Sequence, residues 1–377
     1  MSQADLAAVF HARRRAVLSQ ARRGNKQPAD AAFITKAADL RYLCGSTEGC
    51  TGLYFDRSRA VAFTNTMFVA RVTRECVGCE ISMPKKGVHA GLATVARQRK
   101  RRRIGLREEI LTVPQERSLT KALDGTETCD IAKAINGVRA LKEEGEIAVM
   151  RRAMAIAEDA FRELTGKGAA YFIGKTERHL TAELDYLMRL DGADAMAFAT
   201  IVASGPNSYN CHHVPGDRVV GPDEPVLFDW GAEVDGYRSD TTRVVFTGGV
   251  PEALVPIYQL VLDAHDAAVA KMRPGVRSYT VNEAARGLID AAGYGKEFRH
   301  GLGHGLGLET HEPLGFGKRP TSGTGMILKR GMVLTIEPGV YLEGIGGVRI
   351  EDDILVTPTG HERLNTLPRD LASMILG

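Results

Sequence analysis

The sequence predicts an α+β chain folded into two domains, from its length and from two contrasting patterns of apolar residues. At 377 residues, the chain is longer than one hydrophobic core usually supports. Its opening third alternates short strand-like and helix-like segments, whereas the rest carries long amphipathic helices between glycine-punctuated strands. We therefore expect a mixed αβ domain over residues 1–135 and a second domain over residues 136–377.

Local patterns predict the elements of the first domain in order. Helical periodicity with many arginines predicts a helix over residues 3–22, and "AAFITKAADLRYLCGS" predicts a strand, a short helix and a turn. The alternation in "GLYFDRSRAVAFTN" indicates a hairpin with its bend at Asp56 to Ser58. The stretch "GLATVARQRKRRRIGL" is typical of a basic helix that leads into the strand "RIGL".

The second domain opens with a charged helical stretch, residues 128–160, which we expect to connect the two domains. A long amphipathic helix is predicted from Pro251 to Met272. Apolar strands are predicted at Pro225 to Phe228 and at "TTRVVF", separated by a turn at "EVDGY".

Composition excludes several classes of protein. A net charge of +3 on 95 charged residues gives no general attraction to nucleic acid or membranes. No apolar run approaches the ~20 residues that a membrane span needs, and the charged N-terminal stretch is unlike a signal peptide. Six scattered cysteines suit reduced thiols better than a disulfide framework. We expect a cytoplasmic protein with neither a nucleic-acid nor a membrane partner.

Three short motifs are set aside. "CVGC" at Cys76 to Cys79 has the spacing of a metal knuckle, but no second such pair exists, so we interpret it as structural. "RQRKRRR" has no interleaved aromatic residues and is interpreted as a solvated face of one helix. "HGLGHGLG" departs from the dinucleotide pattern G-x-G-x-x-G at Leu306.

Histidines concentrate in one glycine-rich segment, "FRHGLGHGLGLETHEP". Three of the chain's ten histidines lie here, namely His300, His304 and His311, with glycine at every second position from Gly301 to Gly307. This segment is too rich in glycine for a stable helix. One such histidine is more often structural, but three together indicate a site.

Acidic residues border apolar strands at four places in the same half of the chain: Asp229, Asp240, Glu337 and Glu351. We expect Glu337 directly after a strand and Glu351 inside one. Carboxylates in such surroundings are rarely buried without a partner. Arg243 and Arg349 could neutralise one or two of them, whereas a pair of metal ions could serve all four.

These segments resemble the pita-bread metallopeptidases, which include methionine aminopeptidase, aminopeptidase P, prolidase and the metal-free relative creatinase. The resemblance rests on "DWG…GYRSDTTR", with its aspartates Asp229 and Asp240 eleven residues apart, on "GHGLGLETHEP" and on "EPGVY…GVRIED". The last two are similar to the proline-specific branch. The resemblance covers residues 138–370 densely, and residues 1–135 resemble the creatinase-type N-terminal domain in length and pattern. It implies a creatinase-type domain followed by a pita-bread catalytic domain.

The resemblance implies a set of metal ligands: Asp229, Asp240, His304, Glu337 and Glu351. They would hold two divalent ions, with Asp240 and Glu351 bridging, Asp229 on one ion, and His304 with Glu337 on the other. A site of four carboxylates and one imidazole favours manganese and leaves cobalt, zinc and iron open.

The resemblance also implies roles for residues around the metals. His212, His311 and Glu337 would be catalytic, and His300, His212 and Arg349 would bind substrate. Arg349 and Tyr341 would also hold the carboxylates, while His213 has no match and is expected to be a loop residue. The glycines would let extended backbone pack closely against the site.

The implied activity is hydrolysis of the Xaa-Pro peptide bond by a dinuclear metallopeptidase, through a hydroxide that bridges the metals. His311 or His212 would stabilise the oxyanion and Glu337 would relay the proton to the leaving nitrogen. Proline-containing peptides are the expected partners, and a homodimer is the expected assembly. Prolidase-like members often carry arginine where this chain has Gly315, and the nearest arginine is Arg319. Dipeptides and longer peptides therefore both stay open as substrates.

Two alternatives are weighed against the peptidase. A creatinase-like C–N hydrolase needs no metal, and the intact set of five ligands argues against it. A pita-bread binding module for nucleic acid or histones usually lacks these ligands and would rely on the "RQRKRRR" run.

Overall fold

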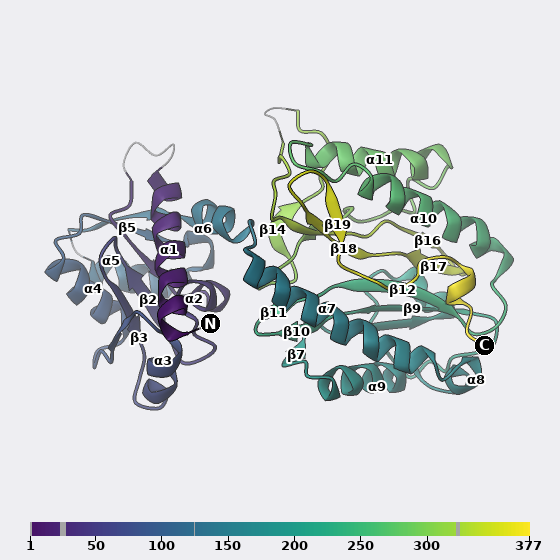
Figure 1. The fold of residues 1–377 in the computed structure, drawn as a ribbon, viewed down its shortest axis with the longest axis horizontal. Helices are drawn as coiled ribbons and strands as arrows, with labels where there is room; N and C mark the ends of the chain where they lie inside the picture. Colours follow the sequence, from purple (N-terminus) through teal and green to yellow (C-terminus); the bar gives the residue numbers. More distant parts are fainter. Residues whose placement is uncertain (1, 23–27, 124, 322–324) are drawn as a thin grey trace. The chain divides into compact units, whose positions relative to one another are not determined.

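A computed structural model describes residues 2–22, 28–123, 125–321 and 325–377 (Figure 1). The chain divides into two compact units, residues 1–139 and 140–377. The expected division after residue 135 falls inside the helix Ala132–Arg139, which belongs to the first unit.

The N-terminal unit is a mixed sheet with helices against it. Among its described residues, the strands pair in the order β4-β3-β2-β1-β5-β6. Its strands are β1 Ala31–Ile34, β2 Gly52–Phe55, β3 Ala60–Phe63, β4 Glu80–Ser82, β5 Arg103–Leu106 and β6 Glu127–Asp130. Its α-helices are α1 Gln3–Arg22, α2 Ala37–Cys44, α3 Val69–Glu75, α4 Val88–Gln98, α5 Val113–Ala122 and α6 Ala132–Arg139, with a short 3-10 helix at Glu108–Ile110.

The first helix, the strand–helix–turn segment and the hairpin are confirmed. Strands β2 and β3 are antiparallel, with Leu53 opposite Ala62, and Asp56 begins the bend. The expected alternation of exposure is wrong, since every residue of both strands is buried. Successive strand residues point to opposite faces, so both faces of this hairpin are covered.

The basic run differs from its prediction. Helix α4 ends at Gln98, so most of the run lies beyond the helix. Arg99 Nε and Arg101 Nη2 contact Asp56 Oδ2 at 3.1 and 2.8 Å, and the Asp56 side chain is fully buried. Two of these arginines therefore bind a buried carboxylate at the hairpin bend, while their side chains stay 34% and 26% exposed.

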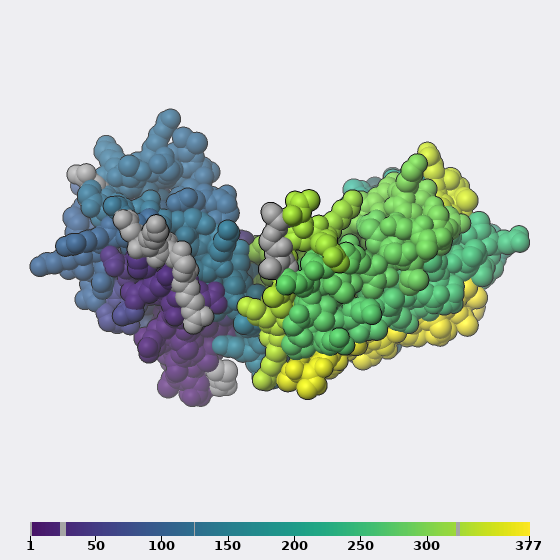
Figure 2. Space-filling view, turned by 90° about the horizontal axis from the view of Figure 1, so that it is seen from above, coloured from purple at the N-terminus to yellow at the C-terminus, as the bar shows by residue number. Residues whose placement is uncertain are grey.

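Among its described residues, the C-terminal unit contains one five-stranded sheet, two three-stranded sheets and one two-stranded sheet, and its helices pack in two groups (Figure 1). Its α-helices are α7 Glu144–Thr165, α8 Ala169–Phe172, α9 Glu177–Leu190, α10 Val255–Val269 and α11 Ser278–Ala291, and its 3-10 helices are η2 Gly205–Tyr209, η3 Glu252–Leu254 and η4 Ala372–Met374. Residues around α10 and α11, coloured green, form the face of this unit seen in Figure 2.

The strands of the C-terminal unit pair into several sheets. Within the described residues the orders are β12-β9-β8, β14-β13-β15-β18-β19, β11-β10-β7 and β16-β17. The strands are β7 Ala195–Met196, β8 Ile201–Ser204, β9 Pro225–Trp230, β10 Ala232–Val234, β11 Tyr237–Arg238, β12 Thr241–Phe246, β13 His304–Gly305, β14 Glu312–Gly315, β15 Val333–Ile336, β16 Gly339–Leu342, β17 Gly346–Arg349, β18 Asp352–Val356 and β19 His361–Arg363.

The turn at "EVDGY" is confirmed as a tight hairpin between β10 and β11. Val234 pairs with Tyr237, and Asp235 and Gly236 have φ of 48° and 75°. Both central residues of this two-residue loop are left-handed, as a type I′ turn requires. The turn sends the chain back so that Asp240 follows β11.

Three predicted elements differ from the structure. The stretch 128–160 is not one helix, because Thr128–Asp130 belongs to strand β6 and two helices follow it. The helix expected from Pro251 to Met272 is a 3-10 turn followed by α10, which ends at Val269. Glu351 lies between β17 and β18, where it forms an isolated bridge with Thr242. In the part of the chain that the structure describes, no helix combines the length and the apolar character needed to span a bilayer.

Candidate active site

A cavity of about 470 Å³ in the C-terminal unit gathers the predicted site residues. We call it the catalytic cavity. Among the residues that line it are His212, Asp229, Asp240, His300, His304, His311, Glu337, Arg349 and Glu351. The structure therefore brings together, in one cavity, residues that are up to 139 positions apart in the sequence.

Strand pairing explains how the carboxylates meet. Asp229 lies in β9 opposite Thr242 of β12, and Thr242 in turn bridges to Glu351. Glu337 directly follows β15, whose neighbour β13 carries His304. The sheets β12-β9-β8 and β14-β13-β15-β18-β19 thus bring acidic side chains to one point.

Three side chains already surround a space suited to a metal ion. One ligand atom each from Asp240, His304 and Glu351 lies within 4.8 Å of the other two. His304 Nε2 is 3.6 Å from both Asp240 Oδ2 and Glu337 Oε1. Asp229 Oδ1 is buried and has no hydrogen-bond partner among the described residues. An oxygen-rich donor set with an unsatisfied carboxylate oxygen fits divalent cations.

Burial and mutual repulsion keep these carboxylates from ionising together. Burial first, and then the neighbouring Glu351 charge, raises the pKa of Asp240 well above its usual range. The same two causes raise the pKa of Glu337, and burial with the Asp229 charge raises the pKa of Glu351 to about 8. Positive charge at the centre of the group would allow all of them to ionise.

Arg349 supplies one fixed positive charge beside the group. Its Nη2 donates to Asp229 Oδ2 at 2.6 Å, its Nη1 to Tyr341 Oη at 2.8 Å, and its Nε to Thr242 Oγ1 at 2.9 Å. All three guanidinium nitrogens are therefore engaged, and the side chain is 3% exposed. This geometry favours the expected role of holding a carboxylate over direct contact with substrate.

His304 is held as a neutral imidazole with one nitrogen free for a metal. Its Nδ1 lies 3.2 Å from the Gly305 carbonyl oxygen, which can only accept, so the proton is on Nδ1. Nε2 then faces the carboxylates with its lone pair. Burial, and then the nearby His311, lowers the pKa of His304 to about 4, and a metal ligand has to be unprotonated.

The other histidines lie at the rim of this group. The rings of His311 and His304 have centroids 4.2 Å apart. His300 Nε2 lies 2.8 Å from Tyr341 Oη, and burial lowers the pKa of His300 to about 4. His212 lines the catalytic cavity from the loop that follows η2.

His213 is more than a loop residue. Its Nε2 lies 2.8 Å from Glu177 Oε2, and the Glu177 side chain is fully buried. Glu177 also accepts from Ser204 N at 2.8 Å and from Gly216 N at 3.1 Å. This buried carboxylate therefore ties down the loop that carries His212.

One glycine of the histidine segment, Gly303, has the expected steric reason. A Cβ on Gly303 would lie 2.0 Å from the Thr335 carbonyl oxygen, which is backbone of the neighbouring strand. No side chain fits there. His304 can therefore reach the carboxylates only because the chain next to it approaches β15 so closely.

Several residues of the site were not predicted. Thr242 Oγ1 donates to Glu351 Oε2 at 2.6 Å, and the Asp240 backbone N–H donates to Asp353 Oδ2 at 3.2 Å. Phe198 and Ile201 line the catalytic cavity with apolar surface. The acidic pair in "IEDD" was visible as a signal for Asp353, whereas nothing in the sequence separates Thr242 or Phe198 from ordinary strand and loop residues.

Comparisons with known proteins agree with this geometry. The sequence profile described as Metallopeptidase family M24 matches residues 148–358, and the one described as Creatinase/Prolidase N-terminal domain matches residues 16–141. An Xaa-Pro dipeptidase of Pyrococcus horikoshii is 40% identical over 241 residues, which are 63% of this chain and 66% of the relative.

Solved structures match over nearly the whole chain. An Xaa-Pro dipeptidase from Bacillus anthracis aligns with a TM-score of 0.89 and 31% identity, over 98% of this chain and 100% of that one. An X-Pro aminopeptidase from Thermotoga maritima aligns with a TM-score of 0.83 and 32% identity, over 91% and 97% of the two chains.

The fold and the site define a two-domain metal-dependent hydrolase with a creatinase-type N-terminal domain and a pita-bread catalytic domain. The chain belongs to metallopeptidase family M24. The expected fold class and the expected family are both confirmed.

Proposed function

We propose that this chain hydrolyses the peptide bond before proline, with two divalent cations bound by Asp229, Asp240, His304, Glu337 and Glu351. The single observation that carries the proposal is the convergence of ligand atoms from Asp240, His304 and Glu351 within 4.8 Å, in the catalytic cavity. The dipeptidase and aminopeptidase relatives support proline as the residue after the cleaved bond.

Manganese is the metal we propose. Four of the five proposed ligands are carboxylates, which are hard oxygen donors. Divalent ions bound there would lower the pKa of a coordinated water and polarise the substrate carbonyl. Four carboxylate charges balance two divalent cations, which relieves the repulsion that raises the pKa of Asp240, Glu337 and Glu351.

The chain's own residues orient the substrate and move the proton. Glu337 borders both His304 and His300, at 3.6 and 3.8 Å, and is the carboxylate we propose as proton carrier to the proline nitrogen. His311 and His212 line the catalytic cavity and are proposed to donate hydrogen bonds to the oxyanion. His300, fixed by Tyr341, is proposed to contact substrate.

Proline places special demands on such a site. It offers no backbone N–H and has a fixed φ, so recognition of the peptide has to use shape and apolar contact. Phe198 and Ile201 line the catalytic cavity and are proposed to contact the ring. Relatives of both kinds, a dipeptidase and an aminopeptidase, are similar to this chain over most of its length, so the length of the peptide is decided by experiment.

The test is release of the N-terminal residue from Ala-Pro and from Ala-Pro-Ala, after exhaustive chelation and after addition of Mn²⁺ or Co²⁺. We expect no activity in the chelated enzyme and recovery with metal on at least one of the two peptides. Gly-Ala-Ala is the control peptide and should not be cleaved. Full activity with metal absent by elemental analysis would overturn the proposal in favour of the metal-free hydrolase.

A homodimer in the cytoplasm is part of the proposal. The dimer rests on the family resemblance, and the location rests on the charged N-terminal stretch and the scattered cysteines. Analytical ultracentrifugation of the full chain tests the dimer. A sedimenting mass near the 40.8 kDa of one chain would contradict it.

A further inference from the structure

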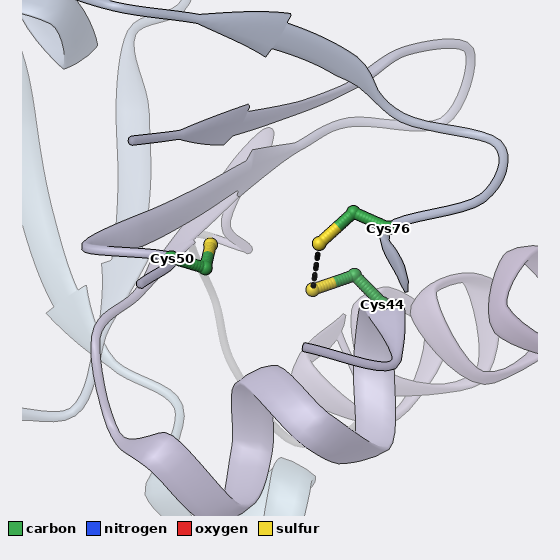
Figure 3. A group of neighbouring side chains, drawn as sticks. All are labelled: Cys44, Cys50 and Cys76. Atoms are coloured by element: carbon green, nitrogen blue, oxygen red, sulfur yellow. Dashed lines mark hydrogen bonds between the residues drawn. The ribbon is translucent and has the colours of Figure 1, made fainter. Parts of the chain in front are cut away.

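Three cysteine side chains of the N-terminal unit converge on one point, and none of them lines the catalytic cavity. Cys44 ends helix α2, Cys50 lies in the loop before β2, and Cys76 follows helix α3. Their sulfur atoms all lie within 4.8 Å of one another. Figure 3 shows the sulfurs of Cys44 and Cys76 facing each other, 3.6 Å apart, with Cys50 arriving from a separate loop. We call this group the thiol cluster.

The spacing of the sulfurs suits a thiolate-bound metal ion. Zinc–sulfur bonds of about 2.3 Å in tetrahedral geometry place neighbouring sulfurs about 3.8 Å apart. The Cys44–Cys76 separation of 3.6 Å is close to that edge, and the third sulfur needs only a small movement. A disulfide would join only two of the sulfurs and would not account for the position of the third.

The backbone that carries two of the three thiols is fixed. Gly45 follows Cys44 with φ of 85°, and a Cβ there would lie 2.9 Å from the Glu75 carbonyl oxygen. Gly49 precedes Cys50 with φ of 82°, and a Cβ there would lie 2.3 Å from Phe68 side-chain carbon. Both positions therefore require glycine, and the loop between the two cysteines is held in one tight path beside α3.

Burial and charge support ligation. Cys44 and Cys76 are buried, whereas Cys50 is partly exposed and offers a route from solvent. The Cys44 and Cys50 thiols donate to the Leu40 and Gly52 carbonyl oxygens at 3.0 and 3.3 Å, so the backbone holds both sulfurs in place. The buried Arg14 guanidinium donates to the Leu43 carbonyl at 2.8 Å, next to Cys44, and adds a positive charge beside the cluster.

We propose that Cys44, Cys50 and Cys76 bind one thiophilic divalent cation of the zinc type, at a structural site separate from the catalytic cavity. Binding releases the thiol protons to solvent, so affinity rises with pH. Water completes the coordination, because Cys79 lies outside the cluster with its sulfur 3.7 Å from Arg14 Nη1. Only Cys76 of "CVGC" belongs to the thiol cluster, and Cys44 and Cys50 supply its other two sulfurs.

The test uses Cd²⁺ as a spectroscopic probe on the full, reduced, Mn²⁺-saturated chain. Cadmium–thiolate bonds give a charge-transfer absorption that oxygen and nitrogen ligands do not give. We expect one Cd²⁺ per chain with this absorption. Removal of a ligand in Cys50→Ser should weaken the affinity by at least ~10²-fold, since even loss of a supporting partner costs 10–100-fold.

Two variants serve as matched controls. Cys129→Ser removes a buried thiol from strand β6 of the same unit, and Cys211→Ser removes the thiol that lines the catalytic cavity. Both should keep the absorption and the affinity of the unaltered chain. Circular dichroism and thermal unfolding show that each variant is folded, and Cys50→Ala replaces Cys50→Ser if the serine variant misfolds.

Three results would overturn the proposal. The first is absence of a thiolate absorption in the reduced chain. The second is an absorption that survives in Cys50→Ser but is lost in Cys211→Ser, which would place the probe in the catalytic cavity. The third is a Cys44–Cys76 disulfide, found by mass spectrometry in chain purified under reductant, because the cluster would then be a redox pair.

Discussion

His304 and His311 differ in the surroundings of their imidazole rings, although the ring centroids lie 4.2 Å apart. His304 donates a hydrogen bond from Nδ1 to the Gly305 carbonyl oxygen. Its Nε2 lies 3.6 Å from both Asp240 Oδ2 and Glu337 Oε1. His311 lines the same cavity but does not belong to the group of close ligand atoms that includes His304. The two rings therefore have different neighbours and, by our proposal, different functions.

Alanine at each position should separate these functions. We expect His304→Ala to lower the metal content per chain, because it removes a ligand. We expect His311→Ala to keep its metal and to lose ~10²–10³-fold in turnover, because it removes a hydrogen bond to the transition state. Metal analysis of both variants, beside the rate on an Xaa-Pro peptide, makes the comparison. The reverse pattern would exchange the two roles, and unchanged metal and rate in both would make the histidines structural.

The charge of Asp240 can be removed without changing its size. Asp240→Asn keeps the shape of a buried side chain but leaves one negative charge fewer for two cations. We expect a loss of at least ~10²-fold in turnover with the fold intact, since the carboxylate is proposed to bridge both ions. Steady-state rates and bound metal per chain test this. Activity equal to that of the unaltered chain would show that Asp240 is not a ligand.

At the residue scale, the acidic positions were predictable because each one interrupts apolar strand sequence. Asp229 ends the run "PVLF" and Glu337 ends "MVLTI". Thr242 was not predictable, because its role arises from pairing between β12 and the Glu351 segment, more than 100 residues later. The thiol cluster was not predicted for the same reason, because its three cysteines come from separate parts of the chain that only the fold brings together.

At the scale of elements, the site depends on close backbone packing of the histidine segment. The glycine pattern predicted that such packing occurs. The sequence indicated that glycines let the histidine segment approach its neighbours, but the neighbour itself, β15, follows only from the fold. For Glu351, the position predicted from the sequence was wrong. Its apolar flanks predicted the interior of a strand, whereas a bridge to Thr242 holds it between two strands.

Two glycines of the same segment provide a matched test of this packing. Gly303→Ala would place a Cβ 2.0 Å from the Thr335 carbonyl oxygen, whereas Gly301→Ala would meet nothing within 4 Å. We expect Gly303→Ala to destabilise the chain by about 2 kcal/mol or more, and Gly301→Ala to stay within about 0.5 kcal/mol. Thermal or urea unfolding of both variants is the measurement. Equal stability would show that the segment can move away from β15 at little cost.

At the scale of the whole molecule, the two-domain α+β architecture was predictable because length and pattern shift point to it. The basic run was misjudged because its partner, Asp56, lies at a hairpin bend some forty residues earlier. Local sequence shows charge but not the buried carboxylate that receives it. A long-range ion pair of this kind gives a charged segment a fixed partner in the fold while its side chains stay partly exposed to solvent.

Metal binding should also control the pH dependence of stability. In the metal-free fold, the pKa of Glu351 is raised from 4.5 to about 8, chiefly by burial, and those of Asp240 and Glu337 are raised well above their usual values. Between about pH 4.5 and 8 Glu351 stays protonated in the fold but ionises in the unfolded chain, and the raised pKa values of Asp240 and Glu337 act in the same direction. The unfolded state then binds fewer protons, so the stability of the metal-free chain falls as pH rises through this window.

Bound cations reverse this dependence, because they hold the same carboxylates ionised in the fold. We expect the Tm of the chelated chain to fall from pH 5 to pH 8 and the Tm with Mn²⁺ to hold or rise, so that the difference widens. The chain's single tryptophan, Trp230, is fully buried beside Asp229 in β9, so its emission reports unfolding of the catalytic unit. Asp240→Asn is the control, since it removes one of the groups and should flatten the slope of the chelated chain. A Tm of the chelated chain that rises across this range would contradict the raised pKa values and, with them, the dependence of this site on cations.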